Sequence, residues 1–342
     1  MSFKYLQKIP TVEEILSELP ISLESKAIKK KRDAEISSVI AGKSDRFLVI
    51  IGPCSAHDEQ ALCDYVSRLA KVNERVKERL ILIPRIYTNK PRTTGEGYKG
   101  MAHQPDPLKL PDVAEGIRAI RRMHLRALAQ SHLSAADEML YPENYPYLED
   151  VLSYVTVGAR SVENQHHRLT ISGLDVPAGM KNPTSGDAEV MLNSVQAAQL
   201  PHVFIYRGYE VSTQGNPYAH CILRGAVNHY GQSIPNYHFE DLIICAEKYR
   251  KRALSNPAII VDTNHANSNK KFHEQPRIAL EVMESRKNSA LLKKTVCGLM
   301  VESYIAEGSQ KPGENEYGKS ITDACLGWAD TEKLLLELAD RV

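Results

Sequence analysis

Four residues that could together bind a transition metal are scattered along the chain. They comprise a thiol, an imidazole and two carboxylates: Cys54, His265, Glu302 and Asp323. A ligand set that mixes soft and hard donors suits Mn²⁺, Fe²⁺, Co²⁺ or Zn²⁺ better than Mg²⁺ or Ca²⁺. Alone, each has an ordinary explanation, since a cysteine is often a small buried hydrophobe and a histidine often completes a hydrogen-bond network. Together they favour a metal site, if the fold brings them to one place.

A second group of residues could bind anions. Its six basic side chains lie in or beside apolar runs: Arg85, Lys90, Arg92, Arg160, Lys181 and Arg224. Arginine offers two parallel N–H bonds to a phosphate or carboxylate, and lysine acts as a mobile point charge. Any one of them could form an ordinary salt bridge, but six favour highly charged substrates. Two phosphorylated substrates, one also a carboxylate, would bring about five negative charges.

Eight short apolar runs would position these residues. They span residues 47–52, 80–87, 133–139, 154–158, 176–180, 202–206, 258–261 and 296–301. Their ends carry Cys54, Arg85 with Lys90, Glu138, Arg160, Lys181, Arg207, His265 and Glu302. In a (β/α)8 barrel the strand C-termini and the loops after them form the catalytic face. The sequence therefore predicts an α/β protein, a (β/α)8 TIM barrel with these side chains at its mouth.

Segments with helical periodicity alternate with the runs and support a parallel sheet covered by helices. The clearest apolar stripes lie in residues 62–76, 188–198, 239–249 and 278–283. Each stripe would pack on the barrel wall. The third run, 133–139, is only weakly apolar, and its position in the series is what identifies it as a strand.

The length of the chain predicts one barrel with an extension. At 342 residues it exceeds a barrel of about 250 residues. We expect an N-terminal extension over residues 1–40, helical at 11–19 and 26–40, and a catalytic barrel over residues 41–342. The extension could cap the bottom of the barrel or form a subunit contact.

Composition excludes several partners. The formal net charge of +1 lacks the basic excess that nucleic acids and membrane surfaces require. The first residues contain no apolar stretch typical of a signal peptide, so a cytoplasmic location is expected. The six cysteines are scattered and include no C-x-x-C pair, which predicts reduced thiols.

One motif points to a cofactor that its context argues against. Residues 95–100 match the dinucleotide-binding pattern G-x-G-x-x-G. That pattern must lead directly from a strand into a helix. Here residues 90–94 intervene, and Pro105, Pro107 and Pro111 prevent a helix afterwards. We therefore expect a loop over a bound anion and no nicotinamide cofactor.

Several short segments resemble those of a known enzyme family. They are Gly52-Pro53-Cys54-Ser55, Lys90-Pro91-Arg92-Thr93, Gly158-Ala159-Arg160-Ser161, Asn264-His265-Ala266-Asn267, Met300-Val301-Glu302-Ser303 and Ile321-Thr322-Asp323-Ala324-Cys325. From about residue 40 onward the chain resembles type I 3-deoxy-D-arabino-heptulosonate-7-phosphate (DAHP) synthases. The resemblance implies a metal-dependent TIM barrel that condenses phosphoenolpyruvate with erythrose 4-phosphate, the first step of the shikimate pathway to aromatic amino acids.

The resemblance also implies roles for the candidate residues. The metal ligands would be Cys54, His265, Glu302 and Asp323. Phosphoenolpyruvate would contact Arg85, Lys90, Glu138, Arg160, Lys181 and Arg224, and erythrose 4-phosphate would contact Lys90, Arg92 and Thr93. The metal would polarise the aldehyde, His265 would act with it, and Lys90 and Asp323 are candidates for proton transfer. Members of this family suggest a homo-oligomer, a dimer or a tetramer.

Three other functions stay open at this stage. A sister synthase would use another aldose phosphate, such as arabinose 5-phosphate, although the intact segment 90–93 argues against it. A Schiff-base aldolase would use Lys181 as its nucleophile without a metal. A barrel without catalysis could serve as a binding protein. Inhibition by an aromatic amino acid, common in the family, is also open, because the extension and residues 204–223 depart from the inhibited forms.

Overall fold

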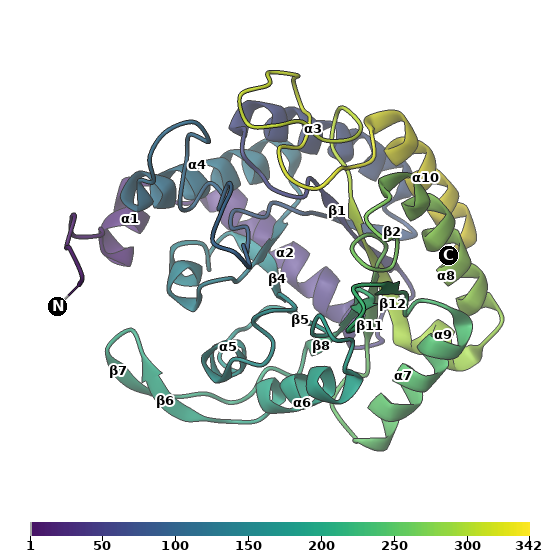
Figure 1. Cartoon of the computed structure of the whole chain (residues 1–342). Helices are drawn as coiled ribbons and strands as arrows, with labels where there is room; N and C mark the ends of the chain where they lie inside the picture. Colours follow the sequence, from purple (N-terminus) through teal and green to yellow (C-terminus); the bar gives the residue numbers. More distant parts are fainter. Residues whose placement is uncertain (1) are drawn as a thin grey trace.

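The computed structural model describes residues 2–342, which form a ring of eight parallel strands surrounded by helices (Figure 1). The ring consists, in chain order, of β1 (Phe47–Gly52), β2 (Leu80–Pro84), β3 (Ala135–Glu138), β4 (Leu152–Val157), β5 (Ala178–Lys181), β8 (Ala219–Leu223), β11 (Ile259–Asp262) and β12 (Val296–Glu302). Each strand pairs with its neighbour in this order, and a bridge between Arg85 and Ala136 joins β2 to β3. The predicted (β/α)8 barrel is confirmed.

The sequence-based assignment of the sixth strand is wrong. Residues 202–206 contain β6 (Val203–Tyr206), which pairs antiparallel with β7 (Tyr209–Ser212) in a hairpin outside the ring. Two of its apolar side chains face solvent, since Val203 is 66% and Ile205 77% exposed. Apolar character alone therefore did not identify a barrel strand. The sixth barrel strand is β8.

Because of this wrong assignment, Arg207 was expected at the barrel mouth, but it lies elsewhere. In the structure this residue lies at the turn of the hairpin, with a positive φ of 51°. Its guanidinium binds the carboxylate of Glu13, 2.6 Å away, in the N-terminal extension. Arg207 is thus a surface ion-pair residue and not a strand-end residue.

The helices cover the outside of the ring (Figure 1). They are α3 (Glu59–Val76), α4 (Val113–Ser131), α5 (Gln165–Ile171), α6 (Ala188–Gln199), α7 (Phe239–Lys251), α8 (Gln275–Lys287), α9 (Ala290–Thr295) and α10 (Trp328–Arg341). The four apolar stripes expected from the sequence lie in α3, α6, α7 and α8, and are confirmed. Shorter elements are the 3-10 turns Pro142–Tyr147 and Phe272–Glu274 and the small ladder of β9 (Ala226–Val227) with β10 (Ser233–Ile234).

Side chains alternate along each strand between the helical layer and the barrel interior. On β2, Leu80 and Leu82 pack with the outer core, whereas Ile81 and Ile83 belong to the inner cluster. The next inward position after Ile83 is Arg85. The lower interior is therefore apolar, and the charged positions follow at the strand C-termini.

The second helix of the N-terminal extension closes the bottom of the barrel. The extension forms α1 (Val12–Glu18) and α2 (Leu23–Ile40), which confirms the expected helices. From α2, Ile36, Val39 and Ile40 are buried in the same cluster as the inward side chains of β1 and β2. Of the two roles left open by the sequence, the structure shows the cap.

Two further observations concern the chain as a whole. All six cysteines have free thiols and are buried, as expected for reduced cysteines. A search of residues 2–342 finds no helix with the length and apolar character needed to cross a membrane.

Candidate active site

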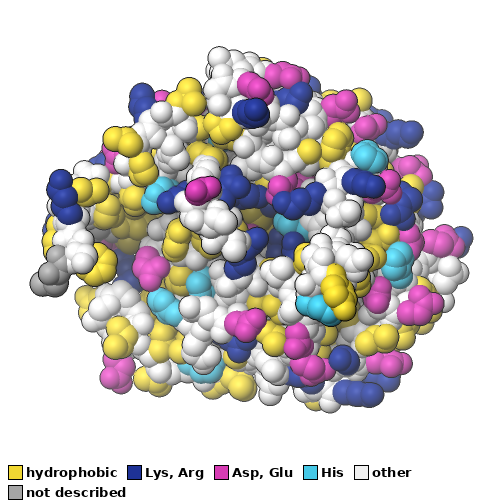
Figure 2. All heavy atoms as spheres, viewed as in Figure 1, with side chains coloured by type: hydrophobic (Ala, Val, Ile, Leu, Met, Phe, Trp, Pro, Cys, Tyr) yellow, Lys and Arg dark blue, Asp and Glu magenta, His cyan; other side chains and the backbone are white. Residues whose placement is uncertain are grey.

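A cleft of about 270 Å³ opens at the C-terminal end of the strands. Eleven of the twelve candidate residues line it: Cys54, Arg85, Lys90, Arg92, Thr93, Glu138, Arg160, Lys181, Arg224, His265 and Asp323. The twelfth, Glu302, is 1% exposed and ion-paired with Arg85. Figure 2 shows Lys and Arg side chains gathered around a hollow near the middle of this face. The fold thus brings residues from distant parts of the sequence to one place.

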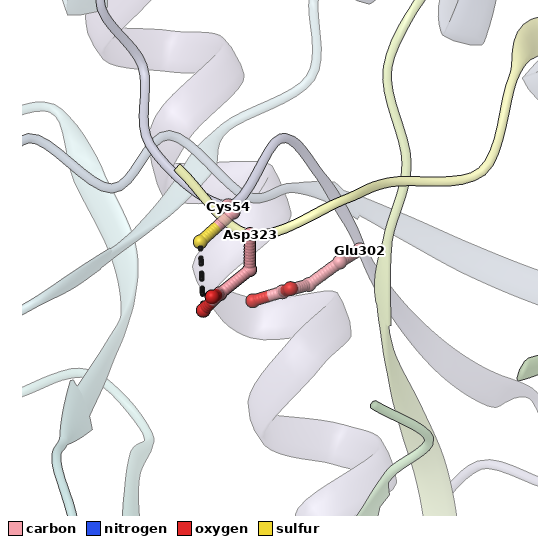
Figure 3. Close-up of side chains that lie close together, drawn as sticks. All are labelled: Cys54, Glu302 and Asp323. Atoms are coloured by element: carbon pink, nitrogen blue, oxygen red, sulfur yellow. Dashed lines mark hydrogen bonds between the residues drawn. The ribbon is translucent and has the colours of Figure 1, made fainter. Parts of the chain in front are cut away.

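Three of the four candidate metal ligands converge (Figure 3). Cys54, Glu302 and Asp323 each offer one ligand atom, and these atoms lie within 4.8 Å of one another. The Cys54 Sγ atom lies 3.5 Å from Asp323 Oδ2. β1 and β12 are neighbours, with Gly52 opposite Glu302 in the parallel register. Pairing of these two strands therefore brings the segment carrying Cys54 beside Glu302.

The fourth candidate, His265, lies beside this group and not within it. Its Nε2 atom is 3.9 Å from Glu302 Oε1. Its backbone adopts a left-handed conformation, with φ of 50°, which is rare for residues other than glycine and is often found at functional sites. Burial lowers the pKa of His265, which favours the neutral ring that a metal ligand requires.

Asp262 lies against the ring of His265 and is a site residue that the sequence reasoning missed. Its Oδ2 atom lies 2.8 Å from His265 Nδ1 and 3.2 Å from Lys181 Nζ. Burial alone would raise the pKa of Asp262, but its contact with His265 and the charge of Lys181 hold it well below its usual range. One signal was available: Asp262 follows the inward-facing Ile260 by two positions on β11.

Glu302 is held from two sides. Asn264 Nδ2 donates to Glu302 Oε2 at 2.6 Å. The other oxygen, Oε1, lies 3.1 Å from the Arg85 guanidinium but is buried without a hydrogen bond from any described residue. Arg85 also stacks 3.7 Å above the centre of the Tyr87 ring and donates to the Pro53 carbonyl. The Oε1 atom therefore keeps unused acceptor capacity that faces the cluster.

Lys90 lies between two of the candidate ligands. Its Nζ atom is 2.8 Å from Cys54 Sγ and 3.0 Å from Asp323 Oδ2. Burial alone would lower the pKa of Lys90, but the neighbouring Cys54, Asp323 and Glu302 outweigh burial and raise it. Lys90 therefore carries a full positive charge in the neutral pH range.

Lys270 is a second cation on Asp323 that the sequence analysis did not identify. Its Nζ atom lies 2.9 Å from Asp323 Oδ1. Burial would raise the pKa of Asp323, but Lys90 and Lys270 hold it well below its usual range. No strand end or periodic position marks Lys270, since it lies in the turn after β11 with a φ of 59°.

The outer part of the cleft presents basic side chains with free donors. Arg160 Nε donates to Thr93 Oγ1 at 2.9 Å, and Arg92 Nε donates to the Tyr98 carbonyl at 2.8 Å. The Nη1 atom of Arg224 is buried without a hydrogen-bond partner among residues 2–342, and burial lowers the pKa of this residue. A buried guanidinium with unused donors is costly without an anion, so the cleft suits phosphates and carboxylates.

Glu138 reaches the cleft because Gly158 leaves room for it. A Cβ atom added to Gly158 would lie 2.5 Å from Glu138 Oε1, closer than any normal contact. The glycine therefore permits a carboxylate beside the anion-binding cations.

The G-x-G-x-x-G segment lies in the irregular connection between β2 and α4, in agreement with the expected loop.

Comparison with known proteins identifies relatives over nearly the whole chain. Residues 18–336 match the family described as the DAHP synthetase I family. The chain is 38% identical over 341 residues to the Tyr-sensitive phospho-2-dehydro-3-deoxyheptonate aldolase of Salmonella typhimurium, covering 97% of this chain and 92% of the relative. It is 37% identical to the Phe-sensitive enzyme of Escherichia coli, covering 98% and 92%. The structure of the Francisella tularensis aldolase of the same name superimposes with a TM-score of 0.93, at 30% identity over 100% of this chain and 98% of that one.

Proposed function

The chain belongs to the DAHP synthetase I family and condenses phosphoenolpyruvate with erythrose 4-phosphate to DAHP and phosphate, and we propose that the residues of the barrel mouth act in this reaction as follows. The observation that carries the assignment of the site is the convergence of Cys54, Glu302 and Asp323 below a cleft lined by cations. The reaction needs an electrophile and several bound anions, and this arrangement serves both.

We propose that Cys54, His265, Glu302 and Asp323 bind a divalent transition metal, with Mn²⁺, Fe²⁺ or Co²⁺ preferred and Zn²⁺ also accommodated. The unused Oε1 acceptor of Glu302 and the neutral ring of His265 support this fit. When bound, the ion would supply Lewis acidity to the aldehyde oxygen of erythrose 4-phosphate. Asp262 would orient the His265 ring through Nδ1, which leaves Nε2 free as the ligand atom.

The substrates are assigned by charge and position. We propose that phosphoenolpyruvate contacts Arg85, Lys90, Glu138, Arg160, Lys181 and Arg224. Erythrose 4-phosphate would contact Lys90, Arg92 and Thr93, in the loop that follows β2. Preorganised cations in a site shielded from water stabilise charge that develops during the reaction.

The condensation joins C3 of phosphoenolpyruvate to the aldehyde carbon. Water adds at C2, and phosphate leaves with cleavage of its C–O bond. Lys90 Nζ is protonated and would donate a proton to the oxygen that forms from the aldehyde. Asp323 holds this ammonium group by its Oδ2 atom, so the two residues would act as one proton-handling unit.

The alternatives find less support. A Schiff-base aldolase needs a neutral Lys181 amine, but Lys181 is 2% exposed and its Nζ atom is ion-paired with Asp262. No observation favours arabinose 5-phosphate. All four candidate metal-ligand positions carry suitable side chains, which argues against a barrel without catalysis.

The remaining expectations concern the chain beyond its site. We propose a homo-oligomer, a dimer or tetramer, supported by the exposed apolar side chains Val203, Ile205 and Tyr209 of the hairpin. Sedimentation equilibrium would measure its size. The cytoplasmic location and the division into residues 1–40 and 41–342 stay predictions.

The test of the site is consumption of phosphoenolpyruvate with erythrose 4-phosphate or arabinose 5-phosphate, before and after chelation and with Mn²⁺ added back. We expect activity with erythrose 4-phosphate alone, lost on chelation and restored by Mn²⁺. Turnover that resists chelation would exclude the proposed metal site. A preference for arabinose 5-phosphate would retain the site and change the substrate.

A further inference from the structure

A second groove rich in cations lies at the opposite end of the barrel from the catalytic cleft. It encloses about 700 Å³ between the start of β1, the ends of α8 and α10, and α9. Cys297, near the start of β12, lines the groove, and Glu302, at the end of the same strand, lies at the mouth. Glu302 follows Cys297 by five positions along the strand, or about 16 Å at about 3.3 Å per residue. The groove is therefore distinct from the catalytic site.

The charge of this basal groove is strongly unbalanced. Seven basic side chains line it: Arg46, Arg79, Arg286, Lys287, Lys293, Lys294 and Arg341. Only Asp45 and the C-terminal carboxylate of Val342 oppose them among the lining residues. Of the seven, Arg46 and Arg341 have acidic partners, Glu35 at 3.8 Å and Glu337 at 2.8 Å. A groove with this charge, in a chain whose net charge is only +1, attracts anions locally.

Arg286 sets this groove apart from an ordinary basic surface. It is 8% exposed, and its Nε atom is buried without a hydrogen-bond partner in the described chain. Its Nη1 atom meets only the sulfur of Met283, at 3.9 Å. The guanidinium stacks on Phe47, 4.5 Å from the ring centre. A buried arginine has five N–H donors and stays charged, so here it lacks the anion that would compensate its burial.

We propose that the basal groove binds a small molecule carrying two or more phosphate charges, with Arg286 at its base and Lys293 and Lys294 at its rim. The volume is that of a small-ligand pocket, about 300–1,000 Å³. Arginine at the base supplies a planar pair of donors, and the lysines at the rim supply mobile charges. Arg46 also lines a neighbouring groove, but there the basic side chains are accompanied by Glu35, Glu74 and Glu78. The unbalanced positive charge is therefore local to the basal groove, which favours a small ligand over an extended polyanion.

The experiment measures pyrophosphate binding to the full-length, metal-free protein by calorimetry. We expect two classes of site, one at the mouth and one in the basal groove. The double substitution Lys293→Ala with Lys294→Ala should weaken the basal class at least about tenfold, since charge-assisted bonds are lost. Arg92→Ala with Arg160→Ala should weaken only the mouth class. The matched control, Lys26→Ala with Lys30→Ala, replaces exposed lysines of α2 and should change neither class.

A second variant separates binding from structure. Arg286→Met keeps an apolar side chain on Phe47 but removes an uncompensated buried charge. We expect it to lose the basal binding class and to unfold at a temperature no lower than that of the unmodified protein. Unfolding at a lower temperature with binding intact would show that Arg286 is only structural. A single binding class, removed by the mouth substitutions and insensitive to those at Lys293 and Lys294, would overturn the proposal.

Discussion

The upper and lower parts of the barrel interior are built by the same strands but have opposite chemistry. On β2, Ile83 lies in the apolar lower cluster, and Arg85, two residues later, lines the cleft. On β12, Met300 lies in that cluster, and Glu302 follows it at the proposed metal site. A step of two residues keeps the side chain inside the barrel, so one strand supplies both packing and chemistry.

The comparison teaches where stability and activity originate. The lower interior contributes apolar burial, at about 25 cal/mol per Å². The mouth buries ion pairs, among them Arg85 with Glu302 and Lys181 with Asp262. Such pairs often fail to recover the cost of their desolvation. Substitutions in the lower interior should therefore affect stability, and substitutions at the mouth should affect activity.

The largest effect is expected at the mouth. Glu302→Gln preserves the shape of the side chain but removes an anionic ligand and the charge partner of Arg85. We expect kcat/KM to fall by about a thousandfold or more, because metal ligation contributes several kcal/mol of transition-state stabilisation. Steady-state kinetics with added Mn²⁺ would measure it, with the exposed Glu307→Gln as control. A loss below tenfold would remove Glu302 from the ligand set.

Substitutions in the lower interior should change the free energy of unfolding rather than the activity. Ile36, on the helix that closes the barrel, is fully buried. Ile36→Ala should lower the free energy of unfolding by about 2–5 kcal/mol through lost burial and a cavity. The value of kcat should not change. Urea unfolding would measure the loss, with Leu23→Ala, at an 89% exposed position of the same helix, as control. A fall in kcat at full occupancy by substrate would contradict the separation of roles.

His220 provides a test of the lower interior by pH. It is fully buried, its Nε2 lies 2.6 Å from the Tyr154 hydroxyl, and burial lowers its pKa to about 4. In the unfolded chain the His220 ring has a pKa of about 6.5, so it binds a proton that the folded protein excludes. Stability should therefore fall between pH 6.5 and 4, by at most about 3 kcal/mol.

The His220 contribution can be isolated by substitution. His220→Gln keeps an acceptor for Tyr154 and should flatten the slope of unfolding free energy against pH in this interval. The exposed His273→Gln should leave the slope as it is. Equal slopes in all three proteins would show that His220 is protonated without cost.

The smallest effect is expected outside both regions. Arg207 forms an exposed ion pair with Glu13, and exposed pairs contribute little to stability. Arg207→Ala should leave kcat, KM and the unfolding temperature unchanged. Loss of activity in this variant would return Arg207 to the mouth, where the sequence had placed it.

Sequence could predict the strands whose apolar runs are continuous and whose ends carry motif residues. β1 and β12 are such strands, and Cys54 and Glu302 were found through them. β8 was missed because His220 interrupts its apolar run, and only the folded barrel shows that Tyr154 satisfies this histidine inside. The hairpin was misread because residues 203–206 form a continuous apolar run like that of a barrel strand, although Val203 and Ile205 face solvent.

The residues that orient the site were the least predictable. Lys270 reaches Asp323 from a turn with left-handed φ angles at Asn269 and Lys270. Asparagine favours this conformation, but lysine gives no sign of it in the sequence. Asp262 lay one residue beyond the assigned run. Both contacts depend on backbone geometry after a strand, which periodicity does not describe.

The junction between β2 and β3 has a consequence for how the barrel moves. One bridge, from Arg85 to Ala136, joins these strands, whereas five residue pairs join β1 to β12. Local opening follows the least bonded edge of a sheet, so amide hydrogens beside this seam should exchange with solvent faster than those of β1. The loop that carries Lys90 and Arg92 leaves the barrel at this seam. The half of the cleft that we propose to bind the aldose phosphate should therefore open more readily than the half that contains Cys54 and Glu302.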